Sequence, residues 1–492
     1  MSRTGSVPLD TRMLVAMAVA VPLFFPGIFS GGLPGPFALG LTDTFVFFEP
    51  YALEFTRALS AGANPFWSHT SAFGAPTLLS LGTGALHPFH LFHLGMPDWL
   101  AFAVGWWARL VLGGSYLYLY LRLQNVSPWI ALAFTQSFLF GGFHLNYSSE
   151  IIGYVMCFFP MLLYYADRIC RLGDRRATSV LLLAAATLGM LLGGFLSVIL
   201  YLCLAAGVYM LLVSTSWRAL LIAGLACTAG VLIGTPAIVE TLAFYPGTGY
   251  DPAQRAWLYA YDPPPITAIN LVIPSVFGNL TEYRAAGMRD FFGSQLGAGL
   301  LSFPLALLSL LALRLPGHAK RPLLFWTATL VLCLALYFNV LGIKQWLAHV
   351  PVINEHPFTR LQTLIALGST IAAAIALDRL LSSDAATQRL AAWLLLGLAL
   401  AMALVYALTW QRFAHLDAGW RLGVFGALCL SGLASLFWAL RQARPAAMVV
   451  FACVCALGSV ATSVAFSTYY RPADYYPDTP VIQAIKDKLA PG

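Results

Sequence analysis

Long apolar segments recur along the whole chain, and they restrict its fold more than any other feature. A helix needs about 20 largely apolar residues to cross the hydrocarbon core of a bilayer. Hydrophobic residues occupy 59% of the 492 positions and charged residues only 10%, whereas about a quarter of a soluble domain is charged. The sequence therefore predicts an all-α, polytopic membrane protein with about 13 transmembrane helices. The expected spans are 13–31, 99–121, 128–145, 151–168, 177–192, 195–213, 219–238, 297–313, 322–341, 360–378, 390–410, 421–440 and 446–466.

Two of these spans are the hardest to delimit. The apolar run over 177–213 is too long for one span, and we expect it to divide at Gly193-Gly194. The span at 360–378 is only moderately apolar because of Gly368-Ser369 and the alanines that follow. The run at 13–31 lacks a small-x-small cleavage site and precedes many further spans, so we interpret it as a retained helix rather than a signal peptide.

Basic residues are concentrated in the short loops on one side of the predicted helices. With the N-terminus placed in the cytoplasm, the inner loops hold 15 of the 27 basic residues, and the outer segments hold 15 of the 20 acidic residues. Since lysine and arginine are retained on the cytoplasmic side, we expect a multi-pass protein of the inner (plasma) membrane with a cytoplasmic N-terminus and an extracytoplasmic C-terminus. The same rule accounts for the net charge of +7 without a nucleic-acid partner.

The outer segments are long or polar, whereas the inner loops are short. We expect a transmembrane domain over 1–466 with outer loops at 32–98, 239–296 and 342–359, followed by an extracytoplasmic tail at 467–492. The inner loops contain neither a P-loop nor a G-x-G-x-x-G motif after a predicted strand. Any sugar or phosphoryl donor is therefore expected to differ from a cytoplasmic nucleotide, and the outer acids indicate chemistry on the outer face.

The first outer loop combines an acid at the membrane boundary with many turn residues. Asp43 directly follows the first apolar segment. Pro50 starts an expected amphipathic helix that carries Glu54 and Arg57 on its polar face. Glycine and proline recur at short intervals after this helix, as is typical of a compact, ordered loop. The apolar face, which we expect to lie in the membrane interface, consists of Tyr51, Phe55, Ala58 and Leu59.

Three histidines follow in the same loop. His87, His90 and His93 are three residues apart, which places them along one side of a helix. Imidazoles at this spacing are typical metal ligands. Histidines near a bilayer also serve as interfacial hydrogen-bonding groups, and Pro88 interrupts the start of the row, so the spacing alone favours the structural interpretation.

Two arginines lie where the membrane makes a charge costly. Arg109 is near the centre of the second span, where a charge costs at least about 2.5–3.5 kcal/mol unless it is paired or hydrated. It therefore pairs with an acid such as Glu150 or lines a cavity. Arg360 follows His356-Pro357 at headgroup depth, where a guanidinium suits a phosphate. The alternative for Arg360 is snorkelling to lipid headgroups.

A series of short motifs runs through most of the chain in a fixed order. It consists of Asp43 after the first helix, Asn64-Pro65-Phe66-Trp67, Phe73-Gly74-Ala75-Pro76, Gly84 before His87-Pro88, Pro160, the proline-rich 262–282 segment, and Pro357 before Arg360. This order resembles the bacterial YfhO-like membrane proteins, within the GT-C class of polyprenol-dependent glycosyltransferases. In that family an aromatic residue usually precedes the proline at position 88, where this chain has His87. The family also often carries a soluble domain after the last helices, of which 475–485 resembles only the beginning.

The resemblance implies a GT-C-like fold with short amphipathic helices in the first outer loop. It also implies a catalytic base in that loop and a polyprenyl-phosphate sugar as donor. On this interpretation Asp43 is the general base of an inverting transfer to a glycan, lipid or protein acceptor, and Arg360 with His356 binds the donor phosphate. On the same interpretation, the substrate or a metal ion such as Mg²⁺ or Mn²⁺ is positioned by Glu49, Glu355, Arg57 and Arg109.

Three alternatives to this mechanism stay open at the level of the sequence. Asp43 caps the next short helix in a purely structural interpretation. A transporter or flippase of a lipid-linked sugar would carry internal repeats and broken helices, and we find no convincing repeat. A glycan polymerase or ligase would share an outward-facing site.

Overall fold

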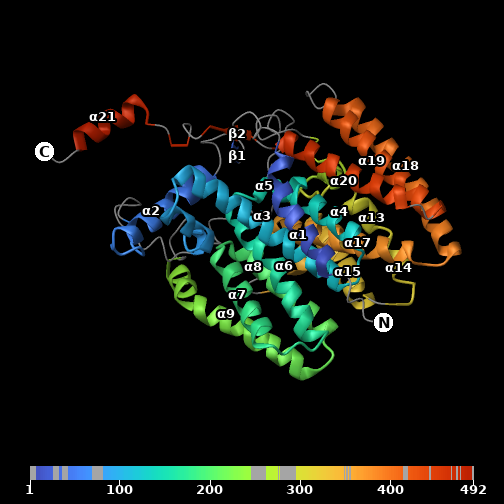
Figure 1. The fold of residues 1–492 in the computed structure, drawn as a ribbon, viewed down its shortest axis with the longest axis horizontal. Helices are drawn as coiled ribbons and strands as arrows, with labels where there is room; N and C mark the ends of the chain where they lie inside the picture. Colours follow the sequence, from blue (N-terminus) through green and yellow to red (C-terminus); the bar gives the residue numbers. More distant parts are fainter. Residues whose placement is uncertain are drawn as a thin grey trace.

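The computed structural model describes most of the chain (Figure 1). The described residues are 7–25, 33–35, 43–68, 81–244, 262–274, 276, 295–317, 319–347, 349–350, 353, 356–413, 419–442, 445–466, 468–471, 475–476 and 478–489. Three parts of the predicted motifs therefore lie outside the described residues: 73–76, the positions 275 and 277–282 of the proline-rich segment, and Glu355.

Helices make up almost all of the described structure. The α-helices are α1 (Val7–Ala20), α2 (Glu49–Ser60), α3 (Asp98–Leu123), α4 (Pro128–Leu139), α5 (Gly142–Tyr147), α6 (Ile151–Cys170), α7 (Ala177–Leu192), α8 (Leu196–Val213), α9 (Trp217–Phe244), α13 (Ser302–Ala306), α14 (Ser309–Ala312), α15 (Lys320–Tyr337), α16 (Ile343–Leu347), α17 (Gln362–Leu381), α18 (Ala385–Phe413), α19 (Gly419–Gln442), α20 (Pro445–Phe466) and α21 (Pro480–Leu489). Short 3₁₀ or π segments are η1 (Val21–Phe24), η3 (Thr44–Phe48), η4 (Leu81–Thr83), η5 (Pro88–Leu94), η6 (Pro265–Leu271), η7 (Val340–Gly342) and η9 (Phe358–Leu361).

Eight of the described helices are long and apolar enough to cross a membrane, which identifies a multi-pass membrane protein. They are α3, α8, α9, α15, α17 with η9, α18, α19 and α20. The other five expected spans hold helices that are short, broken or less apolar. Examples are α7, with 16 residues, and α6, whose apolar run is interrupted by tyrosines and Pro160. The predicted number of about 13 spans is therefore not confirmed.

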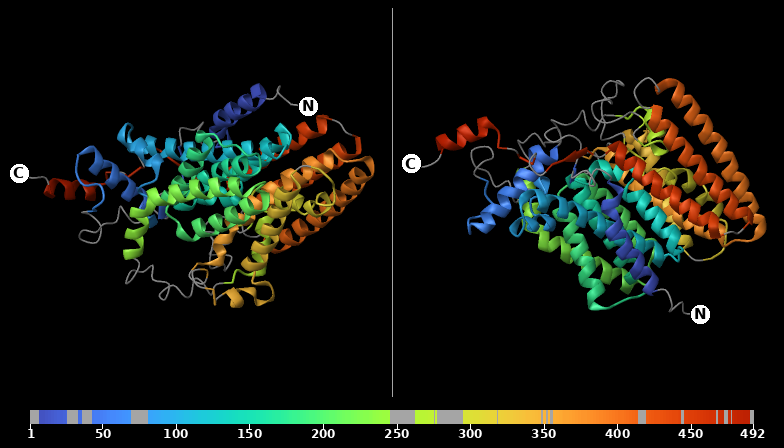
Figure 2. Two further views of the ribbon diagram at one scale, coloured as in Figure 1. Left: turned by 90° about the horizontal axis from the view of Figure 1, so that it is seen from below. Right: turned by 45° about the horizontal axis from the view of Figure 1, so that its top comes forward.

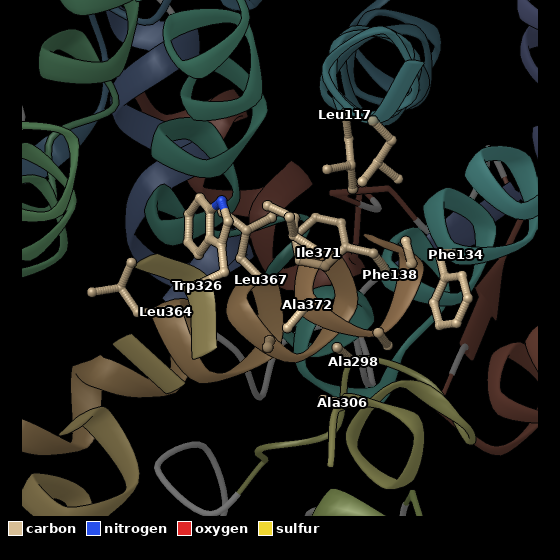
Figure 3. Packing of buried hydrophobic residues seen from close by; sticks show 14 of the residues in the cluster. Leu117, Phe134, Phe138, Ala298, Ala306, Trp326, Leu364, Leu367, Ile371 and Ala372 are labelled. Atoms are coloured by element: carbon tan, nitrogen blue, oxygen red, sulfur yellow. The ribbon is translucent and has the colours of Figure 1, made fainter. Parts of the chain in front are cut away.

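Helix α17 forms the centre of the core (Figure 3). Every residue of this helix except Asp378 and Leu381 is buried. It packs against α4, α13, α14, α15 and α18, and Leu367 and Ile371 lie beside Trp326 and Phe138. The glycine and alanines of this helix let neighbouring helices approach closely. By mean hydropathy this span is as apolar as α19, so its small residues reflect close protein neighbours and do not make it a weak span.

The expected division of the 177–213 run is confirmed. Helix α7 ends at Leu192 and α8 begins at Leu196. Gly194 between them has a φ of +90°, and a Cβ there would lie 1.8 Å from the carbonyl oxygen of Leu81. Only glycine fits this conformation and this contact, so the break also brings the end of the first outer loop against the bundle.

The C-terminal part of the chain returns to the first outer loop. Helices α18, α19 and α20 pack in sequence along one side of the molecule (Figure 2). After α20, strand β2 (Thr468–Tyr470) pairs antiparallel with β1 (Leu33–Gly35), with Leu33 opposite Tyr470. Helix α21 then extends away from the body (Figure 1). The tail is thereby held beside the loop that contains Asp43, while the side of the membrane on which it lies stays a prediction.

Candidate functional site

The segment from Asp43 to Ser60 places most of the candidate carboxylates. Asp43 is exposed and precedes η3, a π-helical segment that continues directly into α2. Its side chain makes no capping hydrogen bond, so the structural alternative for Asp43 has no support in the geometry. The expected helix after Pro50 is present as α2. Its protein-facing side consists of Glu49, Ala52, Leu53 and Thr56.

Asp43 and Arg360 converge on the connection between α5 and α6, which contains Glu150. Thr44, next to Asp43, has its hydroxyl 3.5 Å from both the carbonyl and the hydroxyl oxygen of Ser149. Arg360 donates a hydrogen bond from Nη1 to the Tyr147 hydroxyl at 2.9 Å. The charges of Asp43 and Arg360 both act on Glu150, so all three groups share one neighbourhood.

Glu150 is the buried member of this neighbourhood. Burial raises the pKa of its carboxyl to about 8, the negative charge of Asp43 adds to the rise, and the positive charge of Arg360 opposes it. The glutamate is therefore mainly protonated near neutral pH. A neutral Glu150 leaves Asp43 and Arg360 as the two opposite charges beside it.

The geometry of the α5–α6 connection depends on a glycine. Gly153 lies in the first turn of α6, and a Cβ there would lie 2.4 Å from the carbonyl oxygen of Tyr147. This contact lets the chain fold back so that Tyr147 receives hydrogen bonds from Arg360 and from Gln362, the latter at 2.6 Å. Tyr147 thus holds the start of α17 beside α6.

His356 is bound to α8 and lies four residues before Arg360. Its Nδ1 lies 2.9 Å from the Ser197 hydroxyl, and its carbonyl oxygen accepts a hydrogen bond from Tyr201 at 3.0 Å. The guanidinium of Arg360 lies 5.2 Å from the ring centre of Phe195, just before α8. The pair predicted to bind phosphate is thus anchored on α8.

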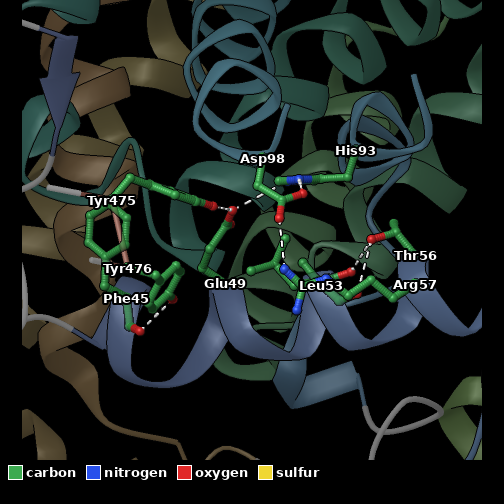
Figure 4. Close-up of polar contacts among 10 residues, drawn as sticks. Phe45, Glu49, Leu53, Thr56, Arg57, His93, Asp98, Tyr475 and Tyr476 are labelled. Carbon is green, nitrogen blue, oxygen red and sulfur yellow. Dashed lines mark hydrogen bonds and ion pairs between the residues drawn. The ribbon is translucent and has the colours of Figure 1, made fainter. Parts of the chain in front are cut away.

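A second polar cluster lies one helical turn further along, around Glu49 (Figure 4). The Glu49 side chain is 1% exposed, and its Oε1 lies 3.3 Å from His93 Nε2. His93 Nδ1 lies 3.2 Å from Asp98 Oδ1, and Asp98 Oδ2 accepts a hydrogen bond from Arg57 at 2.8 Å. Burial lowers the pKa of His93, but hydrogen bonds and charges from Glu49 and Asp98 outweigh burial and raise it overall. The Glu54–Arg57 spacing produces no pair, since Glu54 instead accepts a bond from Ser68.

The three histidines lie in a row, as their spacing predicts. His90 and His93 belong to the 3₁₀ helix η5, and Pro88 begins that helix without interrupting it. A 3₁₀ helix has three residues per turn, so side chains three apart lie above one another. Burial, together with the charge of Arg109, lowers the pKa values of His87 and His90 well below the usual range. Both imidazoles are therefore neutral at physiological pH.

Arg109 forms no ion pair with an acid among the described residues, and its expected position at a cavity stays a prediction. Its guanidinium lies 4.3 Å from the ring centre of Tyr154 and is buried. In the part of the chain that the structure describes, Nε and Nη2 have no hydrogen-bond partner. Glu150 is not its ion-pair partner, and a cation–π contact takes the place of the expected carboxylate.

The C-terminal tail contributes two tyrosines to this cluster, which the sequence did not predict. The Tyr475 hydroxyl donates a hydrogen bond to Glu49 Oε1, and the Tyr476 hydroxyl donates one to the carbonyl oxygen of Phe45 at 2.7 Å. Both rings pack edge-to-face on Phe45. The only signal in the sequence was the Tyr-Tyr-Pro motif itself, which gives no indication of a partner some 430 residues earlier.

The fold and these clusters define an all-α, multi-pass membrane protein with a polar site at one end of its bundle. No protein-family profile matches the chain, and no curated protein matches its sequence. Two solved structures of ArnT from Cupriavidus metallidurans are similar in fold. The structure bound to undecaprenyl phosphate has a TM-score of 0.47 and 16% identity, covering 100% of this chain and 82% of that one. The apo structure has a TM-score of 0.48 and 16% identity, covering 98% and 81%. Matches at this level carry no information on activity, so the resemblance to YfhO-like proteins stays a prediction.

Proposed function

We propose that the protein is an integral membrane glycosyltransferase of the GT-C type. It transfers a sugar from a polyprenyl-phosphate donor to a hydroxyl of a glycan, lipid or protein at the outer face of the membrane. The observation that carries this proposal is that the Asp43 and Arg360 regions meet at the connection between α5 and α6: Arg360 donates a hydrogen bond to Tyr147, and Thr44, next to Asp43, lies against Ser149. These contacts support a site in which Asp43 is the proposed base and Arg360 the proposed phosphate-binding cation, although 317 residues separate them in the sequence.

The chemistry needs these two groups and little else. In a single displacement the acceptor oxygen attacks the anomeric carbon, and the bond from that carbon to the phosphate oxygen breaks. The electron pair leaves with the lipid phosphate, and the acceptor proton passes to the Asp43 carboxylate. Arg360 stabilises the negative charge that develops on the leaving phosphate. The anomeric configuration is inverted because nucleophile and leaving group occupy opposite faces.

Glu150 supports this assignment through its protonation state. If all three groups were charged, the site would carry a net negative charge and repel the donor phosphate. With Glu150 protonated, Asp43 keeps its charge for proton abstraction and Arg360 keeps its charge for the donor. His356 extends the phosphate site from the α8 side, while Arg57 acts on the neighbouring Asp98.

The test is transfer by purified Asp43→Asn protein in nanodiscs, with a radiolabelled polyprenyl-phosphate sugar as donor. Loss of a general base is expected to lower the rate by about 10²–10⁴-fold. Asp478→Asn is the matched control, because Asp478 is an exposed aspartate in the tail whose ion pair in the described part of the chain is with Lys486. We expect it to retain the wild-type rate.

Two outcomes contradict the proposal in different ways. Undiminished transfer by Asp43→Asn removes the base assignment but leaves a glycosyltransferase. Movement of the intact lipid-linked sugar across proteoliposomes, without transfer to any acceptor, identifies a transporter or flippase instead.

A further inference from the structure

The cluster around Glu49 contains acceptor atoms that the protein itself leaves unsatisfied. Glu49 Oε2 and His90 Nε2 are buried, and neither has a hydrogen-bond partner among the described residues. Both belong to side chains that are at most 3% exposed. Buried polar atoms without partners are uncommon in folded proteins and indicate an additional group at that position.

In both His90 and His93, the Nδ1 atom already has an oxygen acceptor as its hydrogen-bond partner. His93 Nδ1 lies 3.2 Å from Asp98 Oδ1. The His90 ring bonds to the backbone of Gly84, and since Nε2 has no partner, Nδ1 is the atom that makes this bond. When Nδ1 carries the proton and donates it to an oxygen, Nε2 presents a lone pair. His90 Nε2 thus presents a lone pair. His93 Nε2 lies 3.3 Å from Glu49 Oε1, and it presents a lone pair to a metal ion when binding of the ion releases its proton.

The available atoms are close enough to share one ion. One carboxylate oxygen of Glu49 and one nitrogen each of His90 and His93 lie within 4.8 Å of one another. Glu49 Oε1 and His93 Nε2 are 3.3 Å apart. A tetrahedral zinc ion with bonds of about 2.0–2.2 Å holds its ligands about 3.3–3.5 Å apart, so this pair already has the required spacing.

We propose that Glu49, His90 and His93 form a binding site for a divalent transition-metal ion, with zinc as the best fit. Two imidazoles and one carboxylate are a typical donor set for zinc with one position left open. Magnesium and manganese prefer oxygen ligands, so the nitrogen donors argue against the ions that the outer-loop carboxylates alone would favour. Asp98 and the Gly84 backbone act as outer partners that fix the ring orientations.

The positive charge of Arg109 influences which group occupies the open coordination position of the metal ion. Its positive charge lowers the pKa of His90 and opposes a bare dication nearby. An anion such as hydroxide or phosphate in the open position compensates for this repulsion, and the Nε and Nη2 atoms of Arg109 are available to donate to it. The proposal is independent of the proposed transfer reaction, because none of the three ligands serves as its base or phosphate-binding group.

The experiment measures zinc bound by the purified full-length protein after chelator treatment and titration with Zn²⁺ alone. We expect about one tightly bound zinc per chain, no displacement by millimolar Mg²⁺, and loss of this zinc in Glu49→Gln, His90→Asn and His93→Asn. Asp98→Asn is expected to weaken binding about 10–100-fold, as other outer partners do. His87→Asn is the matched control, since His87 is an equally buried histidine of the same row that stacks on Tyr154 at 4.6 Å, and it should bind zinc normally.

X-ray absorption spectroscopy of the zinc-loaded wild-type protein provides a second test, whose result does not depend on whether the variants fold. Two imidazoles and one or more oxygens around the zinc support the site. The proposal is overturned if the wild-type protein binds no stoichiometric zinc, or if the spectrum shows thiolate or only oxygen ligands. Equal loss of zinc in His87→Asn and His90→Asn would also overturn it, because the effect would then belong to the histidine row in general.

Discussion

Two carboxylates are completely buried at opposite ends of the helix bundle, and their surroundings differ. Asp167, near the end of α6, is saturated. Its Oδ1 accepts bonds from Tyr209 at 2.6 Å and Arg171 at 3.0 Å, while Oδ2 accepts from Gln124 at 3.1 Å and again from Arg171 at 2.6 Å. Glu49 at the other end accepts bonds on Oε1 but has an unpartnered Oε2 within the described chain.

The difference separates a structural charge from a functional one. Asp167 joins α3, α6 and α8 at the end where the loops are basic, and both oxygens of its carboxylate accept two or more hydrogen bonds. At the Glu49 end, His90 and Arg109 also present polar atoms without partners among the described residues. A cluster that the protein completes by itself stabilises the fold, whereas an incomplete one is where ligands and perturbed pKa values are expected.

The largest expected effect tests this contrast directly by measuring stability. Asp167→Asn leaves Arg171 without its charged partner, and breaking a buried pair costs about 3–5 kcal/mol. We expect the lower end of this range because the Arg171 side chain is 23% exposed. Glu49→Gln in chelator-treated protein should cost only about 1 kcal/mol, since His93 keeps its bond to Asp98. Thermal unfolding of both variants in the same detergent provides the comparison, and equal losses would contradict it.

Replacement of Arg360 is expected to weaken donor binding more than replacement of Arg57, an arginine at the same end whose ion pair is exposed. Arg360→Ala should weaken binding of a polyprenyl phosphate about 10–100-fold, because hydrogen bonds between charged groups contribute about 1.5–3 kcal/mol. Arg57 is 69% exposed and pairs with Asp98, and exposed pairs contribute about 0–1 kcal/mol. Arg57→Ala should therefore change the affinity by less than about threefold. Binding to nanodisc-embedded protein measures both, and similar affinities for the two variants would remove the phosphate role of Arg360.

The same contrast shows how far the sequence could predict this molecule. The positions of the helices followed from hydropathy, because each expected span contains at least one helix, and the α7–α8 break followed from Gly193-Gly194. Local spacing predicted the histidine row and the helix after Pro50. Whether a helix meets lipid or protein is not encoded in hydropathy, however. The small residues of α17 made it look like a weak span, although it is as apolar as α19 and is the most buried of the eight long apolar helices.

The composition of the site was less predictable because it depends on distant contacts. Asp43 and Arg360 were identified from their positions beside predicted helices, but Glu150 entered only as a partner for Arg109, and that pairing was wrong. The Tyr147–Arg360 bond and the Tyr475–Glu49 bond join residues 213 and 426 positions apart. Neither contact has a local signal, since each is set by how several helices and a returning tail pack together.

A smaller effect is expected from the pH dependence of donor binding. Below about pH 8 Glu150 is protonated, so the charges of Asp43 and Arg360 balance. Above that pH the glutamate ionises, and the three groups together carry one negative charge. We expect phosphate binding to weaken by about tenfold, which is the factor that corresponds to a pKa shift of one unit. Glu150→Gln mimics the protonated form and should keep the low-pH affinity up to pH 9.5. Binding curves from pH 6.5 to 9.5 test this, and an identical alkaline loss in wild type and Glu150→Gln would assign the transition to another group.

The smallest effect on stability is expected from the C-terminal tail, which contacts the Glu49 cluster. Tyr475→Phe removes one of the bonds to Glu49 Oε1 and keeps the ring packing on Phe45, so we expect a loss of about 1 kcal/mol. The tail should also exchange amide hydrogens faster around 475–476, because this hydroxyl joins it to α2. Tyr476→Phe is the matched control, since its hydroxyl bonds to a backbone carbonyl and leaves Glu49 unchanged. Faster exchange in Tyr476→Phe alone would show that the main-chain contact, and not the carboxylate, holds the tail against the site.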